Sequence, residues 1–190
     1  MKLGKTIYLT SRKTWRTWLA KHHRTEAEIW LVYYRKETGK PRISYNDAVE
    51  EALCYGWVDS IIKNLDKDRF AQRFSVRKST SSLSQMNKER IRELIAKKKM
   101  TKAGLAAIAH VYNIQKEQPF VIPSEILNEL KANKQAWNNF QKLPGYYTRI
   151  RVAYIESRKR HSKELYQKAL RHFVEMTAKG KRFGFVKEMS

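Results

Sequence analysis

The stretch Ser44–Ser60, SYNDAVEEALCYGWVDS, constrains the fold of this chain more than any other. On a helix, its apolar side chains spread over more than half of the circumference. The remaining polar stripe is narrow, with members three and four residues apart: Asp47, Glu50, Glu51 and Cys54. Because a helix with so wide an apolar surface is mostly buried, we expect the other elements to pack around it.

The boundaries of this central helix are marked by short local signals. Ser44 with Asp47 three residues later has the form of a capping box, which predicts that the helix begins here. Gly56 lets another backbone approach closely or loosens the end of the helix. Trp57-Val58-Asp59 then leads into a strand. We expect the large side chain of Trp57 to be buried.

Strand patterns surround the central helix. They cover Thr6–Leu9, Glu28–Lys36, Val58–Lys63 and Arg69–Val76. The second segment is apolar on both faces, which predicts a central strand. The last two form a hairpin whose turn is Asn64–Asp68.

The other segments show helical patterns. A helix capped by Ser11 precedes the second strand. After the hairpin, one helix ends near Lys97-Lys98-Lys99, a second covers Gly104–Tyr112, and a third, capped by Ser124, covers Glu125–Lys131. The remaining helices are one that carries Trp137 and Phe140, then Tyr146–Arg160 and Lys163–Lys179. In the last helix the buried residues are predicted to be Leu165, Tyr166, Ala169, Phe173 and Met176.

These elements predict an α+β fold. A small, mostly antiparallel sheet of three to four strands is packed by helices, and an all-helical C-terminal region follows. The predicted domains are residues 1–113 and 124–190, joined by a linker over 114–123 that contains Pro119 and Pro123.

The charge of the chain narrows the class of partner. It has 40 Lys and Arg against 18 Asp and Glu, a formal net charge of +22 that divides as +13 over residues 1–118 and +9 over 119–190. A basic surface of this size favours a polyanion, of which nucleic acid is one example. A lysine-rich surface that serves only solubility is the alternative.

Two groups of cations are candidate anion-binding residues. Arg69, Arg73 and Arg77 are predicted to share one face of a strand, about 13 Å apart at each step, where they bind phosphates or acidic helices or are simply solvated. The C-terminal helices contribute the second group: Arg151, Arg158, Lys159, Lys168 and Arg171. This pattern suits non-specific phosphate binding rather than sequence reading.

Few motifs of catalysis or of metal binding are present. The chain has no GxSxG, HExxH, CxxC or GxGxxG motif. His22 and His23 are adjacent, and neighbouring side chains on a helix point about 100° apart, so the two histidines cannot readily bind one ion. We therefore expect no metal and no cofactor. The single cysteine, Cys54, is predicted to be a packing residue with a raised thiol pKa, and it excludes an intrachain disulfide. Neither a membrane span nor a signal peptide is recognisable, so we expect a cytoplasmic protein.

A pocket would change the functional prediction. An enzyme or small-molecule binder is the alternative to a binding protein, with a pocket lined by Trp57, Asp59, Arg73, Arg77 and Asn87. The sequence assigns no catalytic residue, and it leaves the oligomeric state open.

Four segments of the chain resemble the YdeI/OmpD-associated family, also called bacteriocin-protection proteins. They are ALCYGWVDS (Ala52–Ser60), DKDRFAQRFSVRKSTSSLSQMN (Asp66–Asn87), KKKMTKAGL (Lys97–Leu105) and the basic C-terminal segment Leu143–Lys181. The resemblance implies a YdeI-like N-terminal domain and a helical C-terminal segment. It also implies a role in tolerance of bacteriocins and antimicrobial peptides, a form of stress response, without supplying catalytic residues.

The chain departs from the family pattern at several positions. Val76 stands where the family tends to have Pro, Leu83 where it has Trp, and Lys99 where it has Gly, and His161-Ser162-Lys163 replaces a Glu-Thr-Arg type of run. If the family's Pro or Trp shapes a ligand site, that site is altered here.

Overall fold

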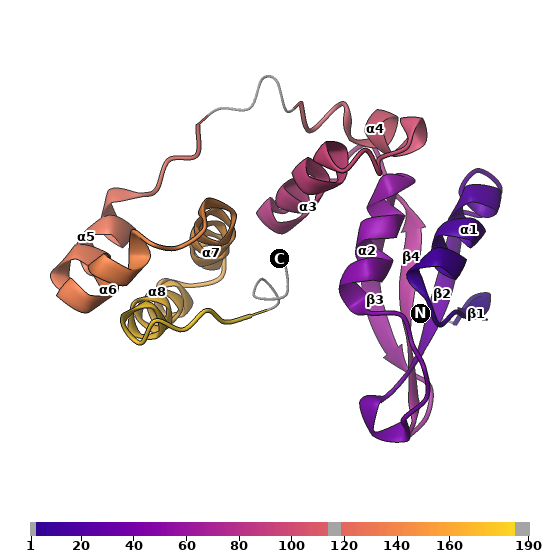
Figure 1. Cartoon of the computed structure of the whole chain (residues 1–190), viewed down its shortest axis with the longest axis horizontal. Helices are drawn as coiled ribbons and strands as arrows, with labels where there is room; N and C mark the ends of the chain where they lie inside the picture. Colours follow the sequence, from indigo (N-terminus) through magenta and orange to yellow (C-terminus); the bar gives the residue numbers. More distant parts are fainter. Residues whose placement is uncertain (1–2, 114–118, 185–190) are drawn as a thin grey trace. The chain divides into compact units, whose positions relative to one another are not determined.

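The computed structural model describes residues 3–113 and 119–184, which form two compact units (Figure 1). The first unit comprises Met1–Leu83 and Arg90–Gln115, and the second comprises Ser84–Glu89 and Lys116–Ser190. Residues 114–118 of the predicted linker lie outside the described residues, and 119–123 contain neither helix nor strand.

The first unit is built on a four-stranded mixed sheet. Its strands are β1 (Thr6–Tyr8), β2 (Glu28–Tyr34), β3 (Trp57–Asn64) and β4 (Arg69–Val76), in the order β1-β2-β4-β3. β1 pairs with β2 in parallel, whereas β2–β4 and β3–β4 are antiparallel. The predicted α+β class and the interior position of β2 are thereby confirmed.

The register of β2 and β4 sorts their side chains onto two faces. Ile29 lies opposite Phe74 and Tyr33 opposite Phe70, all on the face that contributes to the main core. Residues opposite each other in an antiparallel pair point to the same face, so Trp30 and Arg73 lie on the other face.

Two capped helices belong to this unit, α1 (Arg12–His22) and α2 (Tyr45–Cys54). The hydroxyl oxygen of Ser11 accepts a hydrogen bond from the Thr14 amide at 3.2 Å, and that of Ser44 accepts one from the Asp47 amide at 3.0 Å. Both caps satisfy backbone donors that a helix start leaves unpaired, and both predicted helix starts are confirmed.

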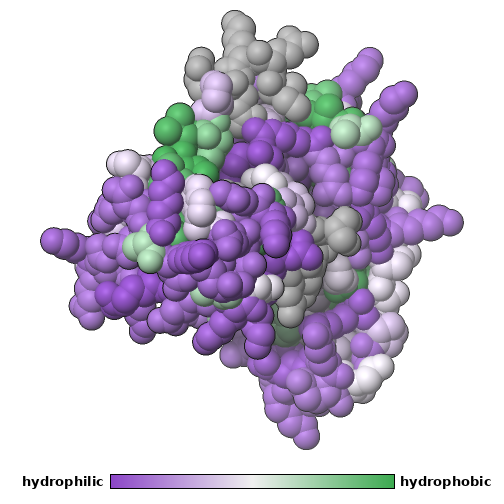
Figure 2. Space-filling view, turned by 60° about the vertical axis from the view of Figure 1, so that its left-hand side comes forward, coloured by the Kyte–Doolittle hydropathy of each residue, from purple (hydrophilic) through white to green (hydrophobic). Residues whose placement is uncertain are grey.

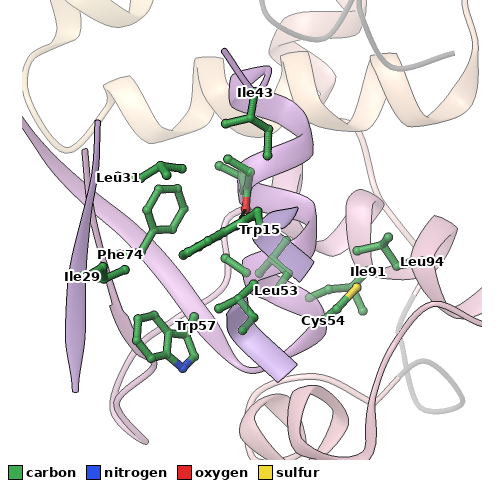
Figure 3. Close-up of a cluster of buried hydrophobic side chains, with 14 of the residues drawn as sticks. Trp15, Ile29, Leu31, Ile43, Leu53, Cys54, Trp57, Phe74, Ile91 and Leu94 are labelled. Carbon is green, nitrogen blue, oxygen red and sulfur yellow. Dashed lines mark hydrogen bonds between the residues drawn. The ribbon is translucent and has the colours of Figure 1, made fainter. Parts of the chain in front are cut away.

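The core of the first unit joins the two helices to the sheet (Figure 3). Trp15 of α1, Trp57 of β3 and Phe74 of β4 are fully buried, and they gather with Leu53 of α2. The indole N–H of Trp15 donates to the Ala48 carbonyl at 3.0 Å, so burial leaves this donor satisfied. The predicted burial of Trp57 is confirmed.

The polar stripe of α2 lies against arginines of α1. Glu51 is only 2% exposed, and its carboxylate accepts from the guanidiniums of Arg12 and Arg16, each at 2.6 Å. Arg12 also contacts Asp47 at 2.7 Å and Glu50 at 2.8 Å. A stripe that would be costly to bury alone is therefore neutralised by the neighbouring helix.

Two more helices and a short 3₁₀ turn complete this part of the chain. They are η1 (Lys36–Thr38), α3 (Gln85–Ala96) and α4 (Lys102–Ile108). α4 was predicted to extend to Tyr112 but ends at Ile108, because the Val111 and Tyr112 amides both donate to the Ile108 carbonyl in a turn. α4 approaches α2 so closely that a Cβ on Gly104 would lie 2.2 Å from the Cys54 carbonyl oxygen.

The second unit contains four helices after the linker: α5 (Ser124–Ala132), α6 (Lys134–Phe140), α7 (Gly145–Arg158) and α8 (Lys163–Ala178). They surround a separate core that includes Leu130, Tyr147, Ile155 and Phe173. The all-helical character predicted for this region is confirmed.

Two local predictions for this unit are corrected. The residue that caps α5 is Pro123, so Ser124 is the first helical residue instead. In α8 the buried residues are Tyr166, Leu170, Phe173 and Thr177, whereas Leu165 is 44% exposed. The buried side is thus set by spacings of four, three and four residues, and the prediction placed it slightly too far round the helix.

Candidate functional site

A polar cluster surrounds Asp59 on the helix-covered face of the sheet. The carboxylate accepts hydrogen bonds from the Tyr45 hydroxyl at 3.0 Å and from the Gln72 side-chain amide at 2.9 Å. A β-bulge follows Asp59, because Ser60 and Ile61 of β3 oppose only Arg73 of β4. Bulges re-aim neighbouring side chains, and this one lies directly beside the Asp59–Gln72 contact.

Two buried arginines lie within the electrostatic reach of Asp59. Arg77 is 7% exposed and donates to the carbonyls of Ser81 and Ser82, at 3.4 and 3.1 Å. Arg90 is 3% exposed and donates to the Asn46 side-chain oxygen at 2.6 Å, with its guanidinium 5.9 Å from the centre of the Tyr45 ring.

Burial changes the protonation chemistry of this cluster. It lowers the pKa of the Arg77 and Arg90 guanidiniums, and the charge of Asp59 opposes that change in both. It also raises the pKa of Tyr45 to about 12, with the Asp59 charge acting in the same direction. Tyr45 therefore remains a hydrogen-bond donor at neutral pH.

The five residues that were predicted to line a pocket have different surroundings in the structure. Trp57 shares the face of Asp59 but is fully buried in the core, where its N–H donates to the His23 carbonyl at 3.3 Å. Arg73 lies on the opposite face of the sheet, where it pairs with Glu28. Asn87 belongs to the second unit. Of the five, the structure brings Asp59 and Arg77 into one electrostatic cluster.

The three arginines of β4 do not form one solvated line. Arg69 pairs with Asp66 at 2.7 Å, and Arg73 donates its Nε–H to Glu28 at 2.8 Å. Arg77 follows the last residue of β4 and turns inward to the carbonyls of the next loop. The prediction extended the strand alternation past the point where β4 ends at Val76.

The second unit carries a row of cations and aromatic rings on α7. The guanidinium of Arg151 lies 4.0 Å from the centre of the Phe183 ring and 4.9 Å from that of Tyr154. Arg158 lies 4.4 Å from the centre of the same Tyr154 ring. We name this set, Arg151, Tyr154, Arg158 and Phe183, the cation–aromatic row. Burial lowers the pKa of Arg151, and neither arginine pairs with a carboxylate of the described residues.

The other predicted cations of this unit have different surroundings. Lys159 lies 3.1 Å from Glu156, 3.4 Å from Glu125 and 4.5 Å from the centre of the Tyr166 ring. Lys168 and Arg171 are exposed on α8. The face of the molecule drawn in Figure 2 is mostly hydrophilic, with hydrophobic residues confined to small patches.

Two kinds of feature are absent from the described residues: a metal-ligand cluster and a membrane-spanning helix. Within residues 3–113 and 119–184, no group of three or more His, Cys, Asp or Glu side chains could hold a metal ion. In the same ranges, each helix is too short or too polar to cross a bilayer. Cys54 is buried and free, and burial, followed by the Glu51 charge, raises the pKa of its thiol to about 11.

Comparison with protein families assigns the two parts of the chain. A family model described as a domain of unknown function, DUF8412, matches residues 7–107, which are more than half of the chain. The chain belongs to the DUF8412 family. A second model, described as "Bacteriocin-protection, YdeI or OmpD-Associated", matches residues 119–180 and confirms the predicted family resemblance in the C-terminal segment. Searches of the curated proteins and of the solved structures found no match.

The polar cluster around Asp59 and the cation–aromatic row of α7 lie in regions matched by different family models. Tyr45, Asp59 and the buried arginines lie within the DUF8412 match, as do the motifs Ala52–Ser60, Asp66–Asn87 and Lys97–Leu105. Arg151, Tyr154 and Arg158 lie within the YdeI match, whereas Phe183 follows it.

Proposed function

We propose that this DUF8412 protein is a non-enzymatic, cytoplasmic binding protein for a polyanion, and that its partner is nucleic acid. The proposal rests chiefly on the cation–aromatic row of α7. There, Arg151 and Arg158 contact the Tyr154 ring on a helix of the second unit, and no carboxylate of the described residues neutralises either guanidinium.

The rings restrain the guanidiniums without removing their charge. A cation over an aromatic face is attracted by the quadrupole of the ring, which holds the side chain while leaving its N–H groups as donors. Arg158 is half-buried and Tyr154 is 41% exposed, so this end of the row is open to a partner. Arg151 is only 8% exposed and serves to position the Tyr154 ring.

Phosphate is the chemistry that suits such a row. Guanidinium groups match phosphate oxygens through paired N–H donors, and a net charge of +22 attracts a polyanion from a distance. Contacts to phosphates carry no sequence information, so the proposed binding is indifferent to sequence.

A salt titration tests the proposal. Binding of fluorescent duplex DNA and RNA, followed by anisotropy from about 50 mM salt upwards, should show micromolar affinity and a steep loss with salt. Because each neutralised phosphate contributes about −0.9 to the slope of log K against log salt, Arg158→Gln should reduce that slope by up to about 0.9.

The neighbouring residue supplies a matched control. Lys159→Gln removes the same charge from the next position, but Lys159 already pairs with Glu125 and Glu156. Its effect on the slope should therefore be much smaller. Equal effects of the two variants would mean that only net charge matters. Absence of binding at tens of micromolar protein would end the nucleic-acid proposal.

Bacteriocin tolerance forms the physiological part of the proposal. It is supported by the description of the family model that matches residues 119–180. Cells that lack the protein should be more sensitive to a cationic bacteriocin, and the Arg158→Gln variant should restore tolerance less well than Lys159→Gln. If both variants restored tolerance equally, tolerance would not depend on the cation–aromatic row.

A further inference from the structure

We propose that the first unit binds a single strand of nucleic acid, with one base stacked on the ring of Tyr8 and the adjoining phosphates held by the loop 35–42. The inference rests on the proposed function for the class of partner, and it names the form of that partner, a strand with unpaired bases. The residues that carry it belong to the first unit, so none of them is part of the cation–aromatic row of α7.

The two faces of the sheet are covered differently. Ile29 and Phe74 point from the sheet towards the helices and form the main core with them (Figure 3). The other face carries a small cluster of buried residues: Trp30, Val32 and Ala71, with Leu3 and Leu65 packed against it. In the part of the chain that the structure describes, no member of this cluster comes from a helix. Tyr34 follows Val32 by two residues and therefore lies on this second face.

Tyr8, the last residue of the edge strand β1, presents an exposed aromatic ring that is held at two points. Its ring centre lies 5.1 Å from that of Tyr34, with the ring planes at 74°, and its hydroxyl donates to the Pro41 carbonyl. In an edge-to-face pair one ring supplies an edge and the other a face, so Tyr34 covers at most one face of Tyr8. Because Tyr8 is 40% exposed, its remaining face can receive a planar group from outside.

The loop that follows β2 places cations beside these rings. It carries four of them: Arg35, Lys36, Lys40 and Arg42. The Lys40 ammonium lies 4.4 Å from the centre of the Tyr34 ring, and the Arg42 guanidinium donates to the Tyr34 carbonyl at 3.2 Å. No carboxylate of the described residues lies within ion-pair distance of any of the four. With Glu37 as its one carboxylate, the loop has four positive charges against one negative, a net charge of +3.

An exposed ring beside unpaired cations suits a base and its phosphates. Bases of any sequence stack on aromatic side chains, and cations neutralise the neighbouring phosphates. In a duplex the faces of the bases are stacked on one another, so only a single strand offers a free face to Tyr8. Trp30 and Val32 are 0% and 8% exposed, so the centre of this face has little apolar surface left for a protein partner.

Two oligomers separate base stacking from phosphate contact. A fluorescent thymidine oligonucleotide of about ten nucleotides and an abasic oligomer of the same length carry the same phosphates. In anisotropy titrations at about 50 mM salt, the full chain should bind the thymidine oligomer at least about fivefold more tightly. Tyr8→Leu should reduce this ratio to about one and leave duplex binding unchanged. Tyr8→Phe keeps the ring and should retain the ratio.

The salt dependence tests the cations of the loop. Lys40→Gln should weaken the binding of both oligomers and lower the slope of log K against log salt by up to about 0.7, the contribution of one single-strand phosphate. Lys21→Gln removes the same charge from an exposed position of α1, a helix that packs on the other face of the sheet, and should lower the slope less.

The α7 variant keeps the two proposals separable. Arg158→Gln should lower the salt slope while the preference for the thymidine oligomer persists, because Arg158 lies in the second unit. Loss of the preference in Tyr8→Leu with no effect of Arg158→Gln would support the single-strand site and contradict the α7 row.

Cross-linking of the parent chain keeps the test decisive if Tyr8→Leu does not fold. A single-stranded oligonucleotide with bromouracil bases is irradiated with the chain, and the digested product is analysed by mass spectrometry. The cross-link should lie on Tyr8. Cross-links confined to the second unit would overturn the proposal.

Three outcomes of the titrations would also overturn it. They are equal affinities of the parent chain for the two oligomers, a preference that persists in Tyr8→Leu, and equal weakening of both oligomers by Tyr8→Leu, which would mean that the ring only positions the loop. Displacement of the oligonucleotide by polyglutamate as effectively as by unlabelled thymidine oligomer would assign the surface to acidic proteins instead.

Discussion

Cys54 illustrates how burial controls chemistry at the scale of one residue. Its side chain is fully buried on α2 beside Glu51. Burial and then the Glu51 charge raise the pKa of the thiol to about 11, while Arg16 and Arg12 oppose this rise. The thiolate is the reactive form, so Cys54 is unreactive near neutral pH.

We expect Cys54 to react with a thiol reagent at pH 8 at least about a hundredfold more slowly in the folded chain than in urea. Stopped-flow absorbance would measure both rates, and a native rate as fast as the denatured one would contradict the packing role.

Because the thiol pKa is higher in the folded chain, the stability gained from its proton is complete below about pH 8.5 and is lost as the pH rises towards 11. Cys54→Ala should therefore lose less stability between pH 8 and 10.5 than the parent chain.

Trp57 is one of the large buried residues whose truncation should strongly destabilise the first unit. It is fully buried, and its ring lies 5.8 Å from that of Trp18. Trp57→Ala should lower the free energy of unfolding by about 3–5 kcal/mol, because it removes apolar contacts and leaves a cavity. Urea denaturation followed by circular dichroism measures this. A loss below about 1 kcal/mol would be incompatible with the packing described.

At the scale of elements, the pairing of α1 with α2 is electrostatic as well as apolar. Glu51 accepts from Arg12 and Arg16, and Arg16 also donates to the Lys99 carbonyl at 3.0 Å. One buried carboxylate thus ties α2 to α1, and through Arg16 to the turn after α3.

Glu51→Gln should destabilise the chain by about 2–4 kcal/mol, because it leaves two arginines without their buried counter-charge. Glu50→Gln is the matched control: Glu50 contacts only Arg12 of this pair and is 19% exposed, so its loss should cost below about 1 kcal/mol. Chemical denaturation of both variants gives the comparison. Equal losses of stability in the two variants would mean that the overall charge of the helix, rather than the buried contact of Glu51, provides the stabilisation.

The elements themselves could largely be predicted from local patterns. Ser11 and Ser44 mark helix starts because a cap depends on neighbours within one turn, and β2 is recognisable because both of its faces are apolar. The partners of Asp59 could not be predicted in this way. Tyr45, Gln72 and Arg90 come from three different elements, and only the folded sheet with its bulge brings them together.

At the scale of the whole molecule, the chain has two separate large cores. One contains Trp15, Trp57 and Phe74, and the other contains Ile155 and Phe173. No residue belongs to both clusters in the part of the chain that the structure describes. Each unit therefore has the apolar interior that a cooperative folding unit needs.

We expect calorimetry to resolve two unfolding transitions, one for each core. Trp57→Ala should lower the midpoint of one transition and Phe173→Ala that of the other, and the effects should add in the double variant because the two residues belong to different cores. A single transition that both substitutions shift alike would show that the two cores unfold together.

The division of α3 has a consequence for how this protein can be cut or recombined. Ser84–Glu89 counts with the second unit, where Met86 joins its core and Glu89 pairs with Arg149 at 2.7 Å. The family match over residues 119–180 omits these six residues. A fragment that begins at the linker would expose the groups that they cover, and a gene fusion made there would transfer an incomplete module. A complete second unit therefore requires the segment Ser84–Glu89 of α3, which ends thirty residues before the family match begins.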